Sequence, residues 1–430
     1  MQRGRVMDKN IWKVIGPGLL FAGAAIGVSH LVQSTRAGAL YGLGLVGVVL
    51  VANISKYPGL SFGSRYTNAT GLSLLEAYRR QGVWTLWLFA ALTCGSMFTV
   101  VAAVTLVTAA VLNTLVLQPL FPSISLQAGA LVLFALVALL MRTGGFRWLD
   151  GAIKGLLGTM AALTFFATCM ALPQVDWSSL SLTLPAGATE VGQVGFIIAL
   201  AGWMPAPMDI SVWNSMWALA KRDATGHRPT PKETGFDFNL GFGLCVVLAL
   251  CFVVLGTVGM HQRGVAPVQG GVGFAKQILG LFTGVLGSWS YPVVGVAALA
   301  VMLSTTLTVL DAFSRVIVIL HARLRGAEQS GEVSRDLAQE SGYWWAFAIL
   351  VVGATALLYL FLKSLGQLVD TATTLSFVTT PALAWFNHRA MFSQEVPEDY
   401  RPGKAMYAMS LVCCISLAAF ALYYLMTRFG

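Results

Sequence analysis

Long apolar stretches, separated by short polar connections, fill this chain from end to end. A helix needs roughly 20 apolar residues to cross the hydrocarbon core of a bilayer. By that measure the pattern predicts eleven membrane-spanning helices. Because no soluble domain fits between them, we expect a single all-α domain over residues 1–430. The predicted spans cover residues 12–41, 43–64, 84–112, 126–142, 149–173, 191–219, 237–260, 288–320, 341–363, 366–388 and 404–427.

The first and the sixth span are interrupted near their middle. In span one, an apolar run ends in Gly27-Val28-Ser29-His30 before Leu31–Tyr41 resumes. In span six, Val194–Trp203 is followed by Met204-Pro205-Ala206-Pro207-Met208-Asp209. Backbone groups left unpaired at membrane depth are tolerated only where they line a cavity. Although one kink at Gly or Pro is often only structural, two matched breaks beside polar residues indicate the binding site of a secondary transporter.

Composition and charge also place the chain in a bilayer. Hydrophobic residues make up 57% of it and charged residues 10%, whereas a soluble domain carries about 25% charged residues. Most Lys and Arg residues precede span one or follow an even-numbered span, which predicts a cytoplasmic N-terminus and an external C-terminus. The net charge of +9 therefore reflects contact with an anionic leaflet rather than with nucleic acid. We expect a monomer in the bacterial inner membrane, with the lipid bilayer as its partner.

The sequence signatures of enzymes are absent. The chain has no phosphate-binding glycine loop, no nucleophile elbow and no His-Glu zinc motif. Its six cysteines lie in apolar spans without metal-ligand spacing, which is typical of small core residues. These observations predict a protein that is not an enzyme and that needs no cofactor apart from a coupling ion.

Several short motifs follow one another in the order and spacing of a known family. They are Gly16-Pro17-Gly18, Ala37-Gly38-Ala39-Leu40-Tyr41-Gly42, Val51-Ala52-Asn53, Gly144-Gly145-Phe146-Arg147, Ser304-Thr305-Thr306 and Asn387-His388-Arg389. In these motifs the chain resembles the NRAMP family of metal-ion transporters. The resemblance implies a LeuT-like fold of two inverted five-helix repeats, with discontinuous helices 1 and 6. The repeats would be spans 1–5 (12–173) and spans 6–10 (191–388), with span 11 (404–427) at the periphery.

The chain departs from this family at the positions of the metal ligands. The family's Asp-Pro-Gly-Asn motif falls on Gly27, Val28, Ser29 and His30, so glycine replaces the anionic ligand. Its Met-Pro-His motif corresponds to Met204-Pro205 by eye, but to Pro207-Met208-Asp209 when counted back from Asn214-Ser215. Span three, where the family carries acidic residues on its proton route, has no acid from Leu92 to Thr99.

These departures favour a small anion, such as bicarbonate, as the substrate. A divalent cation requires carboxylates, several oxygens or deprotonated ligands, and the span-one carboxylate is missing. Half-helix N-termini carry roughly half a positive charge and attract anions, for which Ser29 and His30 supply hydrogen-bond donors. We therefore predict a substrate site without a transition metal. Its predicted residues are Gly27, Ser29, His30, Trp203, Ala206, Pro207 and Asp209.

Three of the polar residues near the breaks leave other interpretations open. Asp209 is ionisable and beside a break, which suits a manganese- or magnesium-type site, a coupling cation, a proton or a basic partner. His30 is alternatively a core histidine bonded to a carbonyl group. Arg36, about two turns farther out, is either a gate residue or a side chain that extends to the outer interface. A proton-coupled divalent-metal transporter is thus the alternative function, and a channel is disfavoured because no span carries a polar stripe.

Span eight carries the candidate site for a coupling ion. Ser304, Thr305 and Thr306 lie in mid-span. In LeuT-like transporters, such hydroxyls hold sodium together with carbonyls of the span-one break, which here would be near Ala24, Ala25 and Gly27. We predict sodium symport on this basis, although such hydroxyls also bond to the preceding turn of their own helix. Two acids are expected along the aqueous path, paired with Arg315 or Lys56; they are Asp311 and Asp370.

Overall fold

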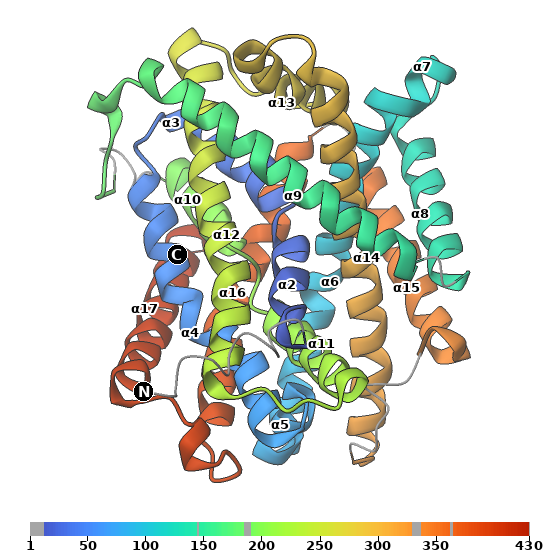
Figure 1. Cartoon of the computed structure of the whole chain (residues 1–430), viewed down its shortest axis with the longest axis vertical. Coiled ribbons are helices and arrows are strands. Elements are labelled where there is room, and N and C mark those ends of the chain that lie inside the picture. Colours follow the sequence, from blue (N-terminus) through green and yellow to red (C-terminus); the bar gives the residue numbers. More distant parts are fainter. Residues whose placement is uncertain (1–12, 144–145, 185–190, 329–336, 362–363, 430) are drawn as a thin grey trace, which may run out of the picture.

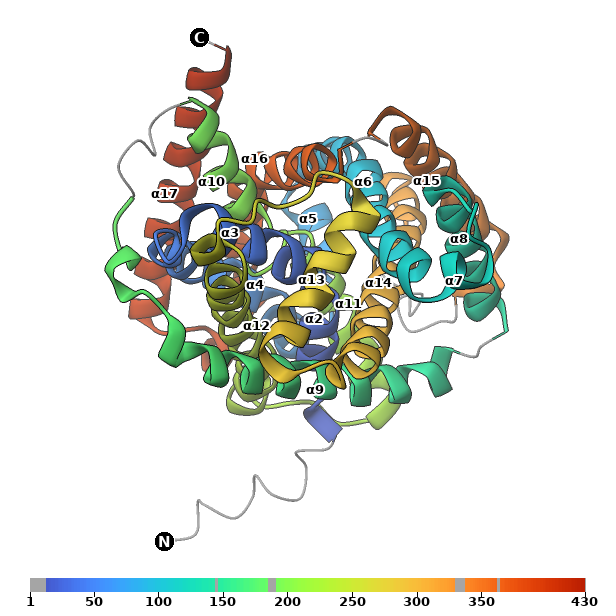
Figure 2. The ribbon, with the colours of Figure 1, turned by 90° about the horizontal axis from the view of Figure 1, so that it is seen from above.

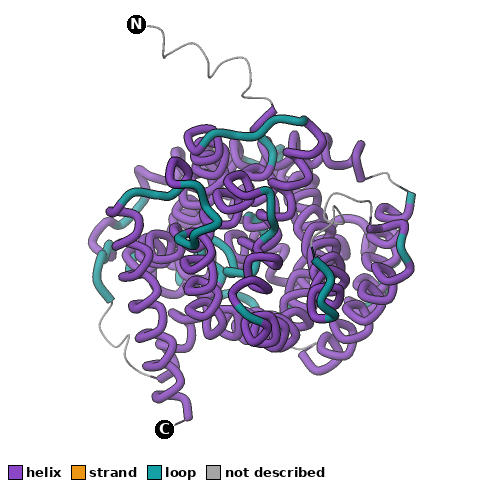
Figure 3. Tube along the Cα trace, turned by 90° about the horizontal axis from the view of Figure 1, so that it is seen from below, coloured by secondary structure: helices purple, strands orange, loops and turns teal. Residues whose placement is uncertain are grey.

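The computed structural model describes residues 13–143, 146–184, 191–328, 337–361 and 364–429. Within these ranges the chain forms helices and no strand (Figure 3). Every predicted span corresponds to one helix or to a broken pair of helices, so the all-α prediction is confirmed. Six of the described helices are long and apolar enough to cross a membrane, and the bent pair of span one is a seventh candidate.

Spans one and six are both broken, as predicted. In span one, α2 (Pro17–Ala25) is followed by the π-helical segment η1 (Ser29–Ser34) and by α3 (Thr35–Tyr41), with a bend of 47° at the break. In span six, α10 (Val191–Gly202) and α11 (Ile210–Thr225) are separated by an irregular segment. Figures 1 and 2 place α2 and α11 in the middle of the molecule, surrounded by the continuous spans.

The continuous spans enclose these broken helices. They are α4 (Val46–Thr70), α6 (Val83–Leu112), α8 (Leu126–Arg142), α9 (Phe146–Ala171), α12 (Pro231–Gly259), α14 (Ser290–Leu324), α15 (Ser341–Phe361), α16 (Leu365–Met391) and α17 (Lys404–Phe429). In Figures 1 and 2, α17 lies at one edge and α8 and α15 at the opposite edge. The most apolar window of α6 is 89% buried and that of α17 only 22%, so α6 belongs to the core and α17 to the periphery.

Two further helices are not predicted by the hydropathy pattern. α5 (Leu74–Gln81) follows α4 and begins at Ser73, whose Oγ accepts a hydrogen bond from the N–H of Glu76. α13 (Gly271–Leu286) lies between α12 and α14 and packs against α14 and α6. With 8 and 16 residues, both helices are shorter than a membrane span, which is why a search for spans passes over them.

Glycines allow α12 to pack closely against both halves of span one. A Cβ atom at Gly18 of α2 would lie 1.9 Å from the carbonyl oxygen of Asp237, and one at Gly38 of α3 would lie 2.1 Å from that of Val253. The carboxylate of Asp237 also accepts hydrogen bonds from the N–H groups of Gly16 and Gly18, at 2.9 and 2.7 Å. Small residues are the usual means of such close helix contact in membranes. The two halves of span one are thereby fixed against a common support.

Candidate functional site

The break in span one is packed against α14. Gly27 lies between α2 and η1, and its carbonyl oxygen accepts hydrogen bonds from the N–H groups of His30 and Leu31. A Cβ atom at Gly27 would lie 2.7 Å from Oγ1 of Thr305, closer than real side chains come. A larger side chain at Gly27 would therefore require Thr305 of α14 to move.

The side chains of Ser29 and His30 are turned toward the protein backbone. Ser29 Oγ donates to the carbonyl oxygen of Ala25 at 2.6 Å and lies 2.7 Å from Nδ1 of His30. His30 Nε2 lies 3.0 Å from the carbonyl oxygen of Cys245 on α12, and the imidazole is fully buried. His30 thus connects the break to α12, which is the arrangement expected of a core histidine.

The break in span six is held by α4 and α16. Trp203 Nε1 donates a hydrogen bond of 2.8 Å to Ser376 Oγ on α16. Lys56, a fully buried residue of α4, donates through Nζ to the carbonyl oxygens of Gly202 at 2.6 Å and Ala206 at 3.1 Å. The carbonyl end of α10 is thus already bonded to a side chain that carries an amino group.

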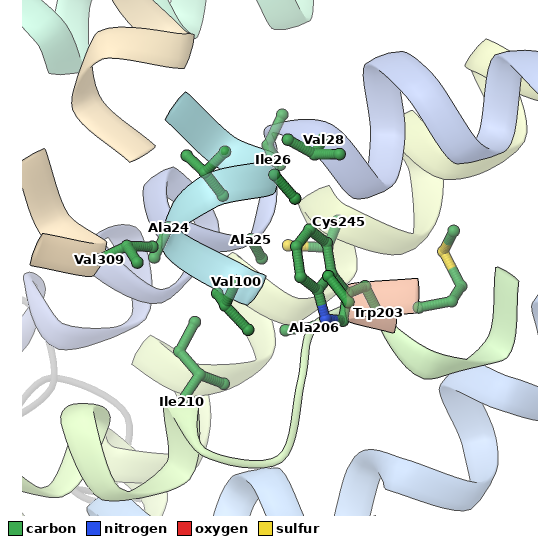
Figure 4. Close-up of a cluster of buried hydrophobic side chains, with 14 of the residues drawn as sticks. Ala24, Ala25, Ile26, Val28, Val100, Trp203, Ala206, Ile210, Cys245 and Val309 are labelled. Carbon is green, nitrogen blue, oxygen red and sulfur yellow. The ribbon is translucent and has the colours of Figure 1, made fainter. Parts of the chain in front are cut away.

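A small cavity lies between the two breaks. Its volume is about 20 Å³, close to that of one water molecule. Most of its lining is apolar, and Figure 4 shows side chains of both breaks and of α6 and α14 meeting around Trp203. The lining residues are Ala24, Ala25, Val28, Ser29, Val100, Val104, Trp203, Pro207, Ile210, Trp213, Thr305 and Val309. Of the predicted site residues, this brings together Ala24, Ser29, Trp203, Pro207 and Thr305, whereas His30 and Asp209 do not line the cavity.

Asp209 lies immediately before α11 and is buried. Its position at a helix N-terminus is favourable for a carboxylate, because the positive end of the helix dipole is there. Within the described residues, its Oδ2 atom has no hydrogen-bond partner. Those residues also contain no group of three or more His, Cys, Asp or Glu side chains that could hold a metal ion.

The three hydroxyls predicted to bind sodium point in different directions. Thr305 Oγ1 lies 3.1 Å from two carbonyl oxygens that can accept its proton, that of Gly23 on α2 and that of Val301 in the preceding turn of α14. Thr306 Oγ1 instead faces α6, where it lies 2.7 Å from Thr108 Oγ1. Ser304 Oγ lies 3.9 Å from the position that a Cβ atom at Gly23 would take. Thr305 and Thr306 therefore do not face a common site in this structure, because adjacent residues of a helix project about 100° apart.

The carbonyl groups expected beside these hydroxyls also need correction. The carbonyl oxygen of Ala25 accepts from Ser29, and that of Gly27 accepts from the N–H groups of η1. The carbonyl that reaches Thr305 is that of Gly23, one turn earlier in α2. A cation held between α2 and α14 would thus lie nearer the N-terminus of α2 than the sequence predicts.

The charged residues of the predicted pathway form two ion pairs. Arg36 on α3 binds Asp370 on α16 through two hydrogen bonds of 2.6 and 3.0 Å. Asp311 pairs with Arg315 at 2.8 Å, which confirms one expected pairing. Lys56 pairs with neither acid and binds carbonyl groups instead. Its role was not predicted, although a lysine in a mostly apolar span is a signal that it has a buried partner.

The broken first and sixth spans, with a cavity between them, define a transporter of the LeuT-like fold. Solved structures of low sequence identity share this fold. A manganese transporter of Eremococcus coleocola superimposes with a TM-score of 0.62 at 13% identity, over 98% of this chain and 88% of that one. Mhp1, a nucleobase-cation-symport-1 family transporter, gives a TM-score of 0.58 at 14% identity, over 96% and 93% of the two chains.

The chain belongs to the Nramp family, whose model, described as natural resistance-associated macrophage protein-like, matches residues 18–427. An uncharacterized protein of Pasteurella multocida is 30% identical over 99% of this chain and 95% of its own length. The divalent metal cation transporter MntH of Burkholderia ambifaria is 28% identical over 63% of this chain and 62% of its own length. The chain is therefore an integral membrane transporter rather than an enzyme.

Proposed function

We propose that this protein is a secondary transporter that carries a small inorganic anion, such as bicarbonate, by alternating access. The observation that carries this proposal is an asymmetry among the half-helix ends at the two breaks. Carbonyl groups at both breaks already receive donors of the protein, Ser29 at α2 and Lys56 at α10. The N-terminal ends of η1 and α11 have no side-chain hydrogen-bond cap. The first N–H groups of η1 and α11 bond to nearby backbone carbonyls such as those of Gly27 and Asp209, so these ends would offer an anion the positive end of the helix dipole rather than unpaired donors.

The donor set of the cavity supports the same choice. A divalent cation needs several oxygen or deprotonated nitrogen and sulfur ligands around it. The cavity offers the hydroxyls of Ser29 and Thr305 and mostly apolar side chains. The position of the family's span-one carboxylate is Gly27, where a larger side chain would collide with α14. An anion, by contrast, is served by hydroxyl and backbone N–H donors.

A divalent metal ion is the second candidate substrate, and the comparisons with known proteins favour it over an anion. The relatives that carry a functional name are divalent metal cation transporters. In this chain the supporting observation is Asp209, whose Oδ2 has no partner among the described residues. A rearrangement that brought Asp209 into the cavity would supply one anionic ligand, and a proton is the coupling ion that this candidate implies.

Sodium is the coupling ion that we propose for anion transport. Thr305 can donate its proton to the carbonyl oxygen of Val301 in its own helix, which would leave the Gly23 carbonyl oxygen and the Thr305 hydroxyl oxygen for the ion, with Ser304 nearby. These are the oxygen ligands that a hard cation prefers, and they join the two repeats. A sodium ion also balances the charge of a monovalent anion during its passage through a low-dielectric path.

The outer ion pair supplies a gate for the proposed cycle. Arg36 of α3 and Asp370 of α16 join the outer half of span one to span ten, and Gln33 donates to the same carboxylate at 3.0 Å. The side chain of Arg36 also lies over the ring of Phe196 on α10. The pair would have to separate when the cavity opens outward. This assignment follows the proposed orientation, with the N-terminus in the cytoplasm of a bacterial cell.

One flux comparison tests the substrate. Purified protein is reconstituted in vesicles that contain a pH-sensitive dye or a dye quenched by Mn²⁺. For an anion transporter we expect internal alkalinisation when bicarbonate is added with sodium, and no quenching by Mn²⁺. Protein-free vesicles are the control. Quenching by Mn²⁺ without alkalinisation would reject the anion proposal and establish the metal candidate.

A further inference from the structure

Lys56 carries a buried amino group that has no part in the proposed transport cycle. It lies on α4, and its side chain is fully buried. Its amino group donates hydrogen bonds to the backbone carbonyls of Gly202 and Ala206 in the span-six break. Asp311 and Asp370, which were expected to pair with Arg315 or Lys56, both pair with an arginine. Lys56 is therefore committed to the backbone of the break.

The packing of α4 explains how Lys56 reaches these carbonyls. Lys56, Gly59 and Gly63 lie on one face of α4, at the spacing of successive helical turns. A Cβ atom at Gly59 would lie 3.0 Å from the side chain of Met208, and one at Gly63 would lie 2.2 Å from the carbonyl oxygen of Ser211. This face of α4 thus runs directly along the break from α10 to the start of α11. Lys56 is the hydrogen-bond donor at the N-terminal end of this face of α4.

The electrostatic setting is suited to a positive charge. The last carbonyls of a helix carry the negative end of its dipole, and Gly202 is the last residue of α10. A buried ammonium group without acceptors would be very costly, so two short hydrogen bonds to these oxygens are the compensation it needs. Carbonyl oxygens are also the ligands that a free hard cation would use at such a break. Here the amino group of Lys56 occupies these oxygens.

We infer that Lys56 is a specificity-determining residue that acts as a tethered cation. It occupies the carbonyl oxygens of the span-six break, makes that side of the cavity positive, and thereby excludes divalent cations while favouring an anion. Pro207, which follows Ala206, lines the central cavity, so the charge lies just behind the cavity wall. The inference rests on the proposed anion transport and names the residue that produces the selectivity.

A side cavity makes this inference testable by chemical rescue. Lys56 lines a second cavity of about 300 Å³ between α4, α10, α16 and α17. Two residues at its rim, Val51 and Leu182, are 63% and 69% exposed, so the cavity reaches the protein surface. Removing the lysine side chain would extend this cavity toward the break. A small alkylammonium ion could then enter and replace the missing group.

The first experiment compares Lys56→Met with the parent protein and with Ser55→Ala. Ser55 lines the same side cavity and donates to the carbonyl oxygen of Ala52, so it is a matched control. In vesicles, Lys56→Met should lose at least about tenfold in bicarbonate flux, which corresponds to about 1.4 kcal/mol, and should begin to admit Mn²⁺. Ser55→Ala should behave as the parent. A folded Lys56→Met protein with parental bicarbonate flux and parental exclusion of Mn²⁺ overturns the inference.

The second experiment uses Lys56→Ala, with folding followed by thermal melting. Propylammonium has the atoms that this substitution removes, and 1-propanol fills the same space without a charge. Restoration of the melting temperature and flux by propylammonium, but not by 1-propanol, supports a tethered cation. Equal rescue by both compounds, or rescue by neither, means that Lys56 only fills space. The melting temperature is independent of the substrate. A parent that transports Mn²⁺ therefore rejects the proposed function and the selectivity inferred for Lys56, whereas rescue of the melting temperature still tests whether Lys56 is a tethered cation.

Discussion

The two breaks at the centre of this transporter are built differently. The span-one break is short and neutral, and its carbonyl groups are met by the hydroxyls of Ser29 and Thr305. The span-six break is longer; it is contacted by the amino group of Lys56 on α4 and carries the carboxyl group of Asp209. The same interruption of a helix can thus be stabilised by close packing and hydroxyl groups or by charge. We therefore expect span one to respond mainly to changes of size, and span six mainly to changes of charge.

The largest effect is expected from adding volume to the span-one break. In Gly27→Val, the new side chain would collide with Thr305, and because overpacking costs about 1–3 kcal/mol, we expect vesicle uptake to fall by roughly ten- to a hundredfold. The control is Gly95→Val in α6, where nothing lies within 4 Å of an added Cβ atom. Both variants should insert and purify as the parent does. Parental flux in Gly27→Val would mean that the break is only a kink.

A smaller loss of uptake is expected when the span-six break loses its proline. Pro207→Leu restores a backbone N–H, and a proline inside a helix is unfavourable by about 3 kcal/mol, so the substitution favours a more continuous helix. The hydrogen bonds from Lys56 oppose that change, and we expect a several-fold reduction of flux rather than its loss. Pro173→Leu, at an exposed site after α9, is the control. A Pro207→Leu protein more impaired than Gly27→Val would reverse the comparison between the breaks.

The sodium site should separate two adjacent threonines. Thr305→Val removes the oxygen beside Gly23, and since one hydrogen-bonding oxygen is worth about 1 kcal/mol, the sodium concentration for half-maximal uptake should rise by roughly fivefold. Thr306→Val removes a contact with Thr108 and should leave that concentration unchanged. Uptake is measured against sodium, with choline as the replacing ion. Equal uptake by the parent in sodium, potassium and choline would show that sodium is not coupled.

The smallest effect is the heat that we expect when Mn²⁺ is added to the parent protein. Because Gly27 supplies no carboxylate and the cavity is mostly apolar, calorimetry of the parent with Mn²⁺ should show no saturable heat at micromolar concentrations. A double variant, Gly27→Asp with Thr305→Ala, makes room for an acid and should gain measurable affinity. Micromolar binding by the parent that disappears in Asp209→Ala would establish the metal candidate and give span six the substrate site.

Much of the fold follows from local properties of the sequence. Runs of apolar residues predict the eleven spans, and Gly27 and Pro207 mark the two interruptions, because hydrophobic length and backbone preference act within a single helix. The helices α5 and α13 are missed because neither is long enough to cross a bilayer. The candidate site is only partly predicted. Ser29, Trp203 and Pro207 do line the cavity, but His30 is turned away toward α12.

That this is a membrane protein with two matched breaks, and that its first span has Gly27 at the break and no carboxylate, follows from the amino-acid sequence. The partners of the buried hydrogen-bonding groups, by contrast, are set by the tertiary structure. Lys56 reaches Gly202, Thr305 reaches Gly23 and His30 reaches Cys245, across separations of 146, 282 and 215 residues. The physical reason is that a hydrogen bond depends on the positions of both partners. The packing of α4, α12 and α14 around the broken helices sets those positions, and no local pattern records it.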